Sequence, residues 1–183
     1  MADIKPFAPV KLVCGIIAGS TDMFRIAENR LAASYGPVDA RGPRVPFLDT
    51  AYYTGEMGPG LSRMFLAFRD LICPDRLPDI KIETNALEDE LREKSGAGGR
   101  TVNLDPGIVT GAALVMATAK DFAHRPPLQK GIYAHLELLF TKAGVKRLEW
   151  TYPDFRTDEH IPFFMAVRKS YLEALIPRVK PLR

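Results

Sequence analysis

Hydrophobic and polar positions at the start of the chain predict a buried strand followed by an amphipathic helix. After Lys11, residues 12–18 form a continuous apolar run, which is typical of a central strand covered on both faces. Thr21 and Asp22 offer an N-cap, and apolar residues then recur at helical spacing until Gly36 closes the segment. We therefore expect a strand and then a helix.

The next part of the chain predicts an irregular edge, a loop, a strand and a second helix. Residues 37–47 alternate but contain Pro43 and Pro46, which favours an edge strand or an irregular ribbon. Residues 49–60 are rich in Tyr, Gly and Pro and predict a loop, whereas residues 61–72 alternate as a strand does. Residues 75–94 carry apolar side chains on one side, with Glu88 elsewhere, and predict a helix.

The C-terminal half predicts a β-meander followed by a last helix. The apolar run 108–119 is ambiguous between strand and helix because of its small residues, and we favour strand. Residues 132–141 predict a strand and residues 161–175 a helix. In residues 103–107, Pro106 holds Asp105 in an extended or turn conformation and Gly107 permits a positive φ, so we expect a chain reversal there.

These elements predict an α+β fold: a single two-layer domain over residues 1–183, with a mixed, largely antiparallel sheet and two or three packed helices. Residues 1–9 and 177–183 are expected to be loosely ordered. Composition agrees with a globular domain, because 46% of the 183 residues are hydrophobic and 26% are charged.

Charge and cysteine usage exclude several classes of protein. The net charge of +3 is too small to indicate nucleic-acid binding. The longest apolar runs are too short to cross a bilayer and no signal peptide is visible, so we expect a cytoplasmic protein without a membrane segment. Cys14 and Cys73 lie far apart, which favours two reduced thiols packed as small hydrophobes, and we expect no metal site.

The densest group of polar side chains follows the run 108–119. Lys120 and Arg125 could hold a phosphate or carboxylate, since Arg forms a bidentate fork and Lys is a point charge. His124 could transfer a proton near neutral pH. The alternative is a solvated turn with the same side chains at the surface.

A second polar group joins the first if the strand after Arg100 lies beside the one that ends at Thr118. A site would then gather around an anionic small molecule, such as a nucleotide or a phosphorylated metabolite, from Arg100, Asn103, Asp105, Lys120, His124 and Arg125. Asp105 or His124 would handle a proton or help bind a divalent ion, and Mg²⁺ is the candidate if a nucleotide is bound.

Aromatic residues mark two further candidate regions. Tyr52, Tyr53 and Glu56 lie in a glycine-rich segment that could be a lid over a ligand or a loop packed by its own tyrosines. Trp150 begins an aromatic stretch that could stack on a base or sugar, or pack a helix end onto the core. A non-catalytic protein-interaction module, with these aromatics as its partner surface, is therefore the alternative function.

Residues 52–58, 103–107, 120–125, 131–134 and 150–154 together resemble a prokaryotic family known as domain of unknown function 4416, and the resemblance covers nearly the whole chain. The family has no established activity to transfer. Some members are labelled GTP-binding proteins, so the resemblance implies a nucleotide ligand, although this chain has no Gly-x-x-x-x-Gly-Lys-Ser/Thr phosphate loop. His135 stands where the resemblance leads us to expect an acidic residue.

Overall fold

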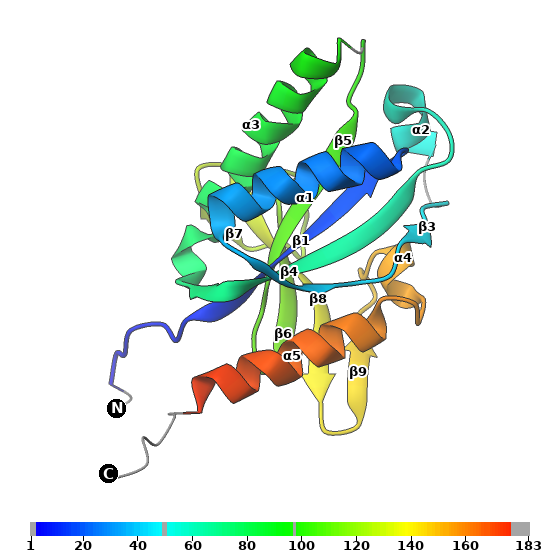
Figure 1. Ribbon diagram of the computed structural model, residues 1–183. Coiled ribbons are helices and arrows are strands. Elements are labelled where there is room, and N and C mark those ends of the chain that lie inside the picture. The colour runs from blue at the N-terminus through cyan, green and yellow to red at the C-terminus, as the bar shows by residue number, and fades with distance from the viewer. Residues whose placement is uncertain (1–2, 49–50, 97, 177–183) are drawn as a thin grey trace, which may run out of the picture.

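The computed structural model describes residues 3–48, 51–96 and 98–176 as one open sheet with helices packed against it (Figure 1). The strands are β1 (Val10–Ala18), β2 (Val38–Arg41), β3 (Val45–Pro46), β4 (Ser62–Ile72), β5 (Val102–Val109), β6 (Ala113–Thr118), β7 (Pro127–Gln129), β8 (Ile132–Thr141) and β9 (Gly144–Arg147). The helices are α1 (Thr21–Tyr35), α2 (Ala51–Met57), α3 (Leu77–Ser95), α4 (Pro153–Arg156) and α5 (Ile161–Leu175), with a 3₁₀ turn η1 (Pro74–Arg76) before α3.

The sheet is antiparallel at each of its strand pairs in the described ranges. Its order is β2-β4-β1-β5-β6-β8-β7, with β3 paired to β4 and β9 paired to β8. The predicted α+β class and largely antiparallel sheet are confirmed. All nine residues of β1 are buried, as expected for a central strand.

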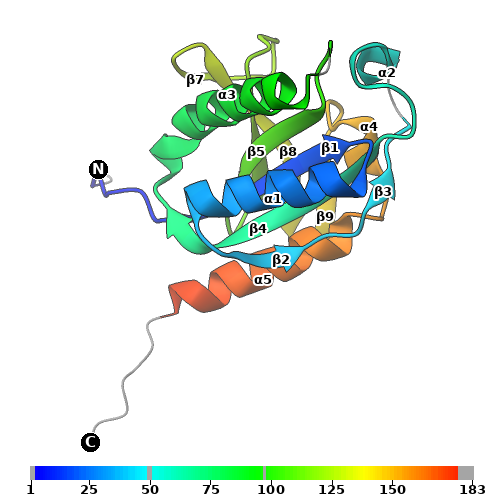
Figure 2. The same cartoon turned by 45° about the horizontal axis from the view of Figure 1, so that its top comes forward.

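Helices cover both faces of the sheet, whereas a single helical layer was expected. Helices α1 and α3 lie over one face of the sheet and α5 over the other (Figure 2). Leu12 and Leu66 pack with residues of α1 and α3, whereas Val13 and Phe65 pack with residues of α4 and α5. Successive side chains of a strand point to opposite faces, and β1 and β4 are apolar at both sets of positions. The two central strands therefore need a cover on each side.

Three local predictions are wrong. Residues 51–57 form α2 instead of part of a loop, and the helix is followed by Gly58 at a φ of 78°. Residues 103–107 belong to β5 and make no chain reversal, and Gly107 does not have a positive φ. The N-cap of α1 is Ser20 instead of Thr21 or Asp22, because the side chain of Ser20 accepts a hydrogen bond from the N–H of Met23.

The structure describes most of the N-terminal segment that was expected to be loosely ordered, but not the C-terminal one. Residues 3–9 have no regular secondary structure and are exposed, and residues 177–183 lie outside the described ranges. None of the helices in those ranges is long and apolar enough to cross a membrane.

Strands β5 and β6 separate after a short ladder, and this separation creates the site described below. They pair only over residues 107–109 and 114–116. The N–H of Thr110 bonds to the carbonyl of Ala113, so the backbone groups of alternate residues, Pro106 included, also point toward β6. Pro106 has no N–H to donate, and the ladder ends there.

Gly107 makes the last pair of that ladder possible. A Cβ atom at this position would lie 2.5 Å from the sulfur of Met116 and 2.8 Å from the carbonyl oxygen of Val115. The two residues therefore have opposite effects on strand pairing: Gly107 allows β5 and β6 to approach each other, and Pro106 ends the ladder so that the strands separate.

Candidate functional site

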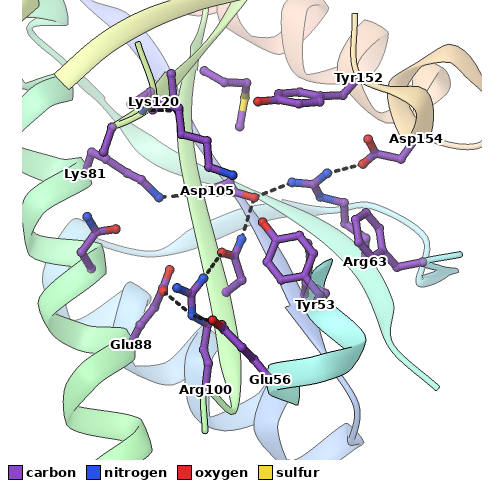
Figure 3. A pocket seen from close by; sticks show the side chains of 18 of the residues that line it. Tyr53, Glu56, Arg63, Lys81, Glu88, Arg100, Asp105, Lys120, Tyr152 and Asp154 are labelled. Carbon is purple, nitrogen blue, oxygen red and sulfur yellow. Dashed lines mark hydrogen bonds and ion pairs between the residues drawn. The ribbon is translucent and has the colours of Figure 1, made fainter. Parts of the chain in front are cut away.

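A cleft of about 820 Å³ occupies the space between the separated strands (Figure 3). We call it the β5–β6 cleft. Helices α2 and α3, strands β4, β5, β6 and β8, and the segment around α4 all contribute to its walls. Its charged lining residues are the cations Arg63, Lys81, Arg92, Arg100 and Lys120 and the acids Glu56, Glu88, Asp89, Asp105 and Asp154.

Asp105 lies at the centre of this charged group. Its Oδ2 accepts hydrogen bonds from Arg63 at 2.5 Å and from the amide of Asn103 at 2.7 Å, and its Oδ1 lies 3.5 Å from Nζ of Lys81. Burial by itself would raise the pKa of Asp105, but the charges of Lys81 and Arg63 outweigh burial and hold the pKa below its ordinary value. Asp105 is therefore an ionised carboxylate at neutral pH.

Arg63 reaches Asp105 across an intervening strand. Gly15 on β1 pairs with Phe65 of β4 on one side and with Asp105 of β5 on the other. A Cβ at Gly15 would lie 2.8 Å from the Phe65 ring and 3.4 Å from Nε of Arg63, so glycine leaves the space that the guanidinium crosses. Arg63 also donates to Asp154 of α4, and the two carboxylates outweigh the effect of burial and raise its pKa.

Two side chains of α3 take the place of the missing β6 partner at Leu104. The N–H of Leu104 donates to Oε1 of Glu88 at 2.6 Å, and its carbonyl accepts from Nζ of Lys81 at 2.9 Å. Buried backbone groups need such partners. Lys81 and Glu88 therefore stabilise the open edge of β5 and also line the cleft.

The pKa of Glu88 in the cleft is raised into the neutral range. Burial raises its pKa to about 7, and the nearby charge of Lys81 opposes this effect only in part. Nε of Arg100 lies 3.6 Å from Glu88 and 3.6 Å from Glu56 on α2, so Arg100 joins the two walls. Its Nη1 also donates to Asn103 at 3.0 Å.

Tyr53 and Tyr152 bring hydroxyl groups to the cleft. Burial, followed by the charge of Asp105, raises the pKa of Tyr53, so its hydroxyl stays protonated at neutral pH. The hydroxyl of Tyr152 accepts from Nη2 of Arg125 at 2.6 Å, which leaves its own proton for another acceptor. Both rings point toward the charged group at the centre (Figure 3). The side chain of Tyr52 lies outside the described part of the structure.

Arg125, His124 and Trp150 are not among the residues that line the cleft. Arg125 is buried and donates to the Lys120 carbonyl, to Nδ1 of His135 and to Tyr152, so its nitrogens are directed at protein groups. His124 stacks on Trp150 and lies 3.3 Å from His135. Arg125 and His124 therefore contact the lining residues His135 and Tyr152 from outside the cleft, and Trp150 packs against His124.

The remaining predicted residues come together. Three separate parts of the chain contribute predicted residues to the lining of the β5–β6 cleft: Tyr53 and Glu56, then Arg100, Asn103 and Asp105, and finally Lys120. No group of three or more His, Cys, Asp or Glu side chains in the described ranges is arranged to hold a metal ion.

Comparison with known protein families matches residues 8–171 to the domain of unknown function DUF4416. The chain belongs to this family. Neither the curated proteins nor the solved structures contain a match to it.

Sequence reasoning missed several residues of the DUF4416 cleft. Arg63 was placed among the alternating residues of a strand, Glu88 was placed away from the buried side of its helix, and Lys81 was not singled out. The signal was present for the last two, because they occupy buried positions at i and i+7 of α3 alongside apolar neighbours. Other lining residues that were not singled out include Asn85, Asp89, Arg92, Tyr152 and Asp154.

Proposed function

We propose that this DUF4416 protein binds a small anionic molecule, of the class that includes nucleotides and phosphorylated metabolites, in the β5–β6 cleft. The observation that carries the proposal is the set of largely buried charges around Asp105. The side chains of Arg63 and Lys81 are 7% and 9% exposed, and that of Asp105 is 22% exposed. Buried ion pairs contribute little net stability, and perturbed groups in a cleft are typical of functional sites.

The size of the cleft supports a ligand of metabolite size. Small-molecule sites usually enclose roughly 300–1,000 Å³, and the cleft of about 820 Å³ lies within this range. Backbone edges, hydroxyl groups and both signs of charge border it. Such a lining suits a polar ligand better than an apolar one.

The charge of the cleft depends on Glu88. Because burial raises its pKa to about 7, Glu88 carries its proton in part of the molecules near neutral pH. A protonated Glu88 leaves five cationic side chains in the lining beside four other acidic ones. An incoming anion favours this protonated form, so we expect binding to be accompanied by proton uptake.

Lys120 and Arg100 are the cations that we assign to the anion. Lys120 is exposed at the end of β6, and Arg100 lies where α2 and α3 meet at the cleft. Asp105 is already neutralised by Arg63 and Lys81, which does not suit it as a metal ligand. A Mg²⁺ ion would therefore enter with the phosphates of a nucleotide. We further propose a cytoplasmic location, which the unpaired thiols of Cys14 and Cys73 support.

The proposed function is tested by calorimetric titration with phosphate, pyrophosphate, ribose 5-phosphate and nucleotides, with and without Mg²⁺. We expect at least one of these anions to bind, and Lys120→Ala and Arg100→Ala each to weaken that anion roughly tenfold. Lys146→Ala is the matched control, because Lys146 is exposed on β9, away from the cleft lining. No saturable binding, or equal losses in Lys146→Ala, would rule the proposal out.

The alternative of a protein-interaction module stays a prediction, and two of the aromatic side chains that suggested it have other contacts in the described part of the structure. The ring N–H of Trp150 donates to the carbonyl of Leu136 at 2.8 Å, and its face is stacked on His124. Tyr53 lines the cleft. Trp150 is therefore engaged in contacts within the protein, and Tyr53 belongs to the wall of the cleft.

A further inference from the structure

Strand β6 presents an uncovered backbone edge to the cleft. Ala117 pairs with Ala134 of β8, but the N–H of Ala134 bonds to the carbonyl of Pro126 on the far side of β8. Partners in an antiparallel ladder turn their backbone groups either toward each other or both away. The backbone groups of Ala117 therefore point away from β8, toward β5. Thr118 is the last residue of β6 and pairs with Tyr133, so its carbonyl points toward β8. The N–H of Ala119 belongs to the same peptide group and points the opposite way, toward β5, although Ala119 itself lies in a bend.

The residues of β5 opposite this edge do not complete it. Continuing the register of Gly107 with Met116 places Pro106 opposite Ala117, and Pro106 has no N–H for the Ala117 carbonyl. The next position, Leu104, gives its N–H to Glu88 and its carbonyl to Lys81. The Ala117 carbonyl and the Ala119 N–H thus face the cleft without a strand partner on β5.

We propose that this edge binds the heterocyclic base of a nucleotide, with the Ala117 carbonyl as acceptor and the Ala119 N–H as donor. The carbonyl of one residue and the N–H of the residue two positions later lie side by side on a strand edge. Nucleobases carry the complementary arrangement, a donor next to an acceptor, on their hydrogen-bonding edges. The small side chains of Ala117 and Ala119 leave the edge uncovered.

The surroundings of the edge fit the rest of such a ligand. Ala117, Thr118 and Ala119 all line the cleft, together with Tyr53 and Tyr152. Lys120 follows Ala119 directly and is assigned above to the anionic group. The inference rests on the proposed function for its location, but it adds a claim that the anion site does not require: the base contributes affinity of its own.

The test compares ribose 5-phosphate with the four common nucleoside 5′-monophosphates by calorimetry. We expect at least one nucleotide to bind roughly tenfold more tightly than ribose 5-phosphate, as one or two added hydrogen bonds would produce. Ala119→Pro deletes the donor and is expected to remove this preference while ribose 5-phosphate binds as before. Thr118 is already extended, as a residue before proline must be. Ala119→Gly retains the N–H and should keep the preference.

A second measurement on the unaltered protein avoids any effect of proline on folding. In an amide-resolved NMR titration, the tighter-binding nucleotide should shift the Ala119 amide resonance, whereas ribose 5-phosphate should shift it much less. Equal affinities for ribose 5-phosphate and every nucleotide, or an unmoved Ala119 amide, would overturn the base-binding proposal and leave the anion site intact. Failure of all these phosphates to bind would overturn both proposals.

Discussion

Arg63 on β4 donates a hydrogen bond of 2.5 Å to Asp105 on β5, although β1 runs between the two strands. The crossing is possible because β1 has Gly15 at the position that pairs with Asp105. The central ion pair of the cleft therefore depends on the absence of a side chain at one residue.

Gly15→Ala should destabilise the protein by roughly 1–3 kcal/mol, because an added methyl group in a packed core displaces its neighbours. Here the neighbours are the Phe65 ring and the Arg63 guanidinium. Urea denaturation measures the change. Gly55→Ala is the control: nothing lies within 4 Å of its added Cβ, and alanine favours the helix α2. Equal stability of the two variants would contradict the crossing.

Asp154→Ala should cost about 3 kcal/mol of unfolding free energy, since it leaves the buried Arg63 with half of its carboxylate partners. Asp158 offers a matched exposed pair: its side chain is 94% exposed beside Arg147. We expect Asp158→Ala to change stability by less than about 0.5 kcal/mol. Chemical denaturation measures the unfolding free energy of both variants. Similar small losses in the two would show that Asp154 does not stabilise the buried Arg63.

Glu88→Gln should make stability less dependent on pH. The pKa of Glu88 is raised in the fold from 4.5 to about 7. Between these values the unfolded chain loses the proton while the folded chain keeps it, so native stability falls as pH rises through this window. Glutamine cannot ionise and still offers an oxygen to the N–H of Leu104.

The variant should therefore be more stable than the natural protein at pH 8, by up to about 3 kcal/mol. The difference should shrink toward zero at pH 4, where both side chains are neutral. Denaturation curves at pH 4, 6 and 8 provide the measurement. A difference that does not vary with pH would mean that Glu88 titrates normally in the fold.

Pro106→Ala should close part of the cleft. It supplies an N–H opposite the carbonyl of Ala117 and so allows the β5–β6 ladder to extend by one residue. We expect the amide introduced at position 106 to exchange slowly with solvent and anion binding to weaken, with no loss of stability beyond about 1 kcal/mol. Fast exchange at position 106 together with unchanged binding would show that proline does not hold the strands apart.

The regular elements could be predicted from the sequence because each has its own periodic signal. The run 12–18 is apolar on both faces and lies within β1, and the helical spacing in residues 161–175 matches the bounds of α5. The ambiguous run 108–119 resolved into the end of β5, a turn and β6. The hydrophobic pattern of a segment was therefore sufficient to predict its secondary structure wherever that structure does not depend on neighbouring segments.

The cleft could be predicted only in part, because it depends on what lies beside each element. Pro106 and Gly107 are residue types that favour turns, but pairing with β1, and at Gly107 also with β6, holds them in a strand. Arg63 and Lys81 are residue types usually found at the surface. Both are buried here because they pair with Asp105, which is distant from them in the sequence. Arg125 was grouped with Lys120 because they are close in sequence, whereas the fold directs its guanidinium toward His135 and Tyr152.

The most direct test of the central claim is an amide-resolved NMR titration of the protein with pyrophosphate, the simplest probe of an anion site between β5 and β6. We predict saturable shifts concentrated at residues 100–105 and 117–120, and their loss in Lys120→Ala but not in Lys146→Ala. Saturable shifts confined to another surface, or none at millimolar pyrophosphate, would contradict a ligand site between these strands.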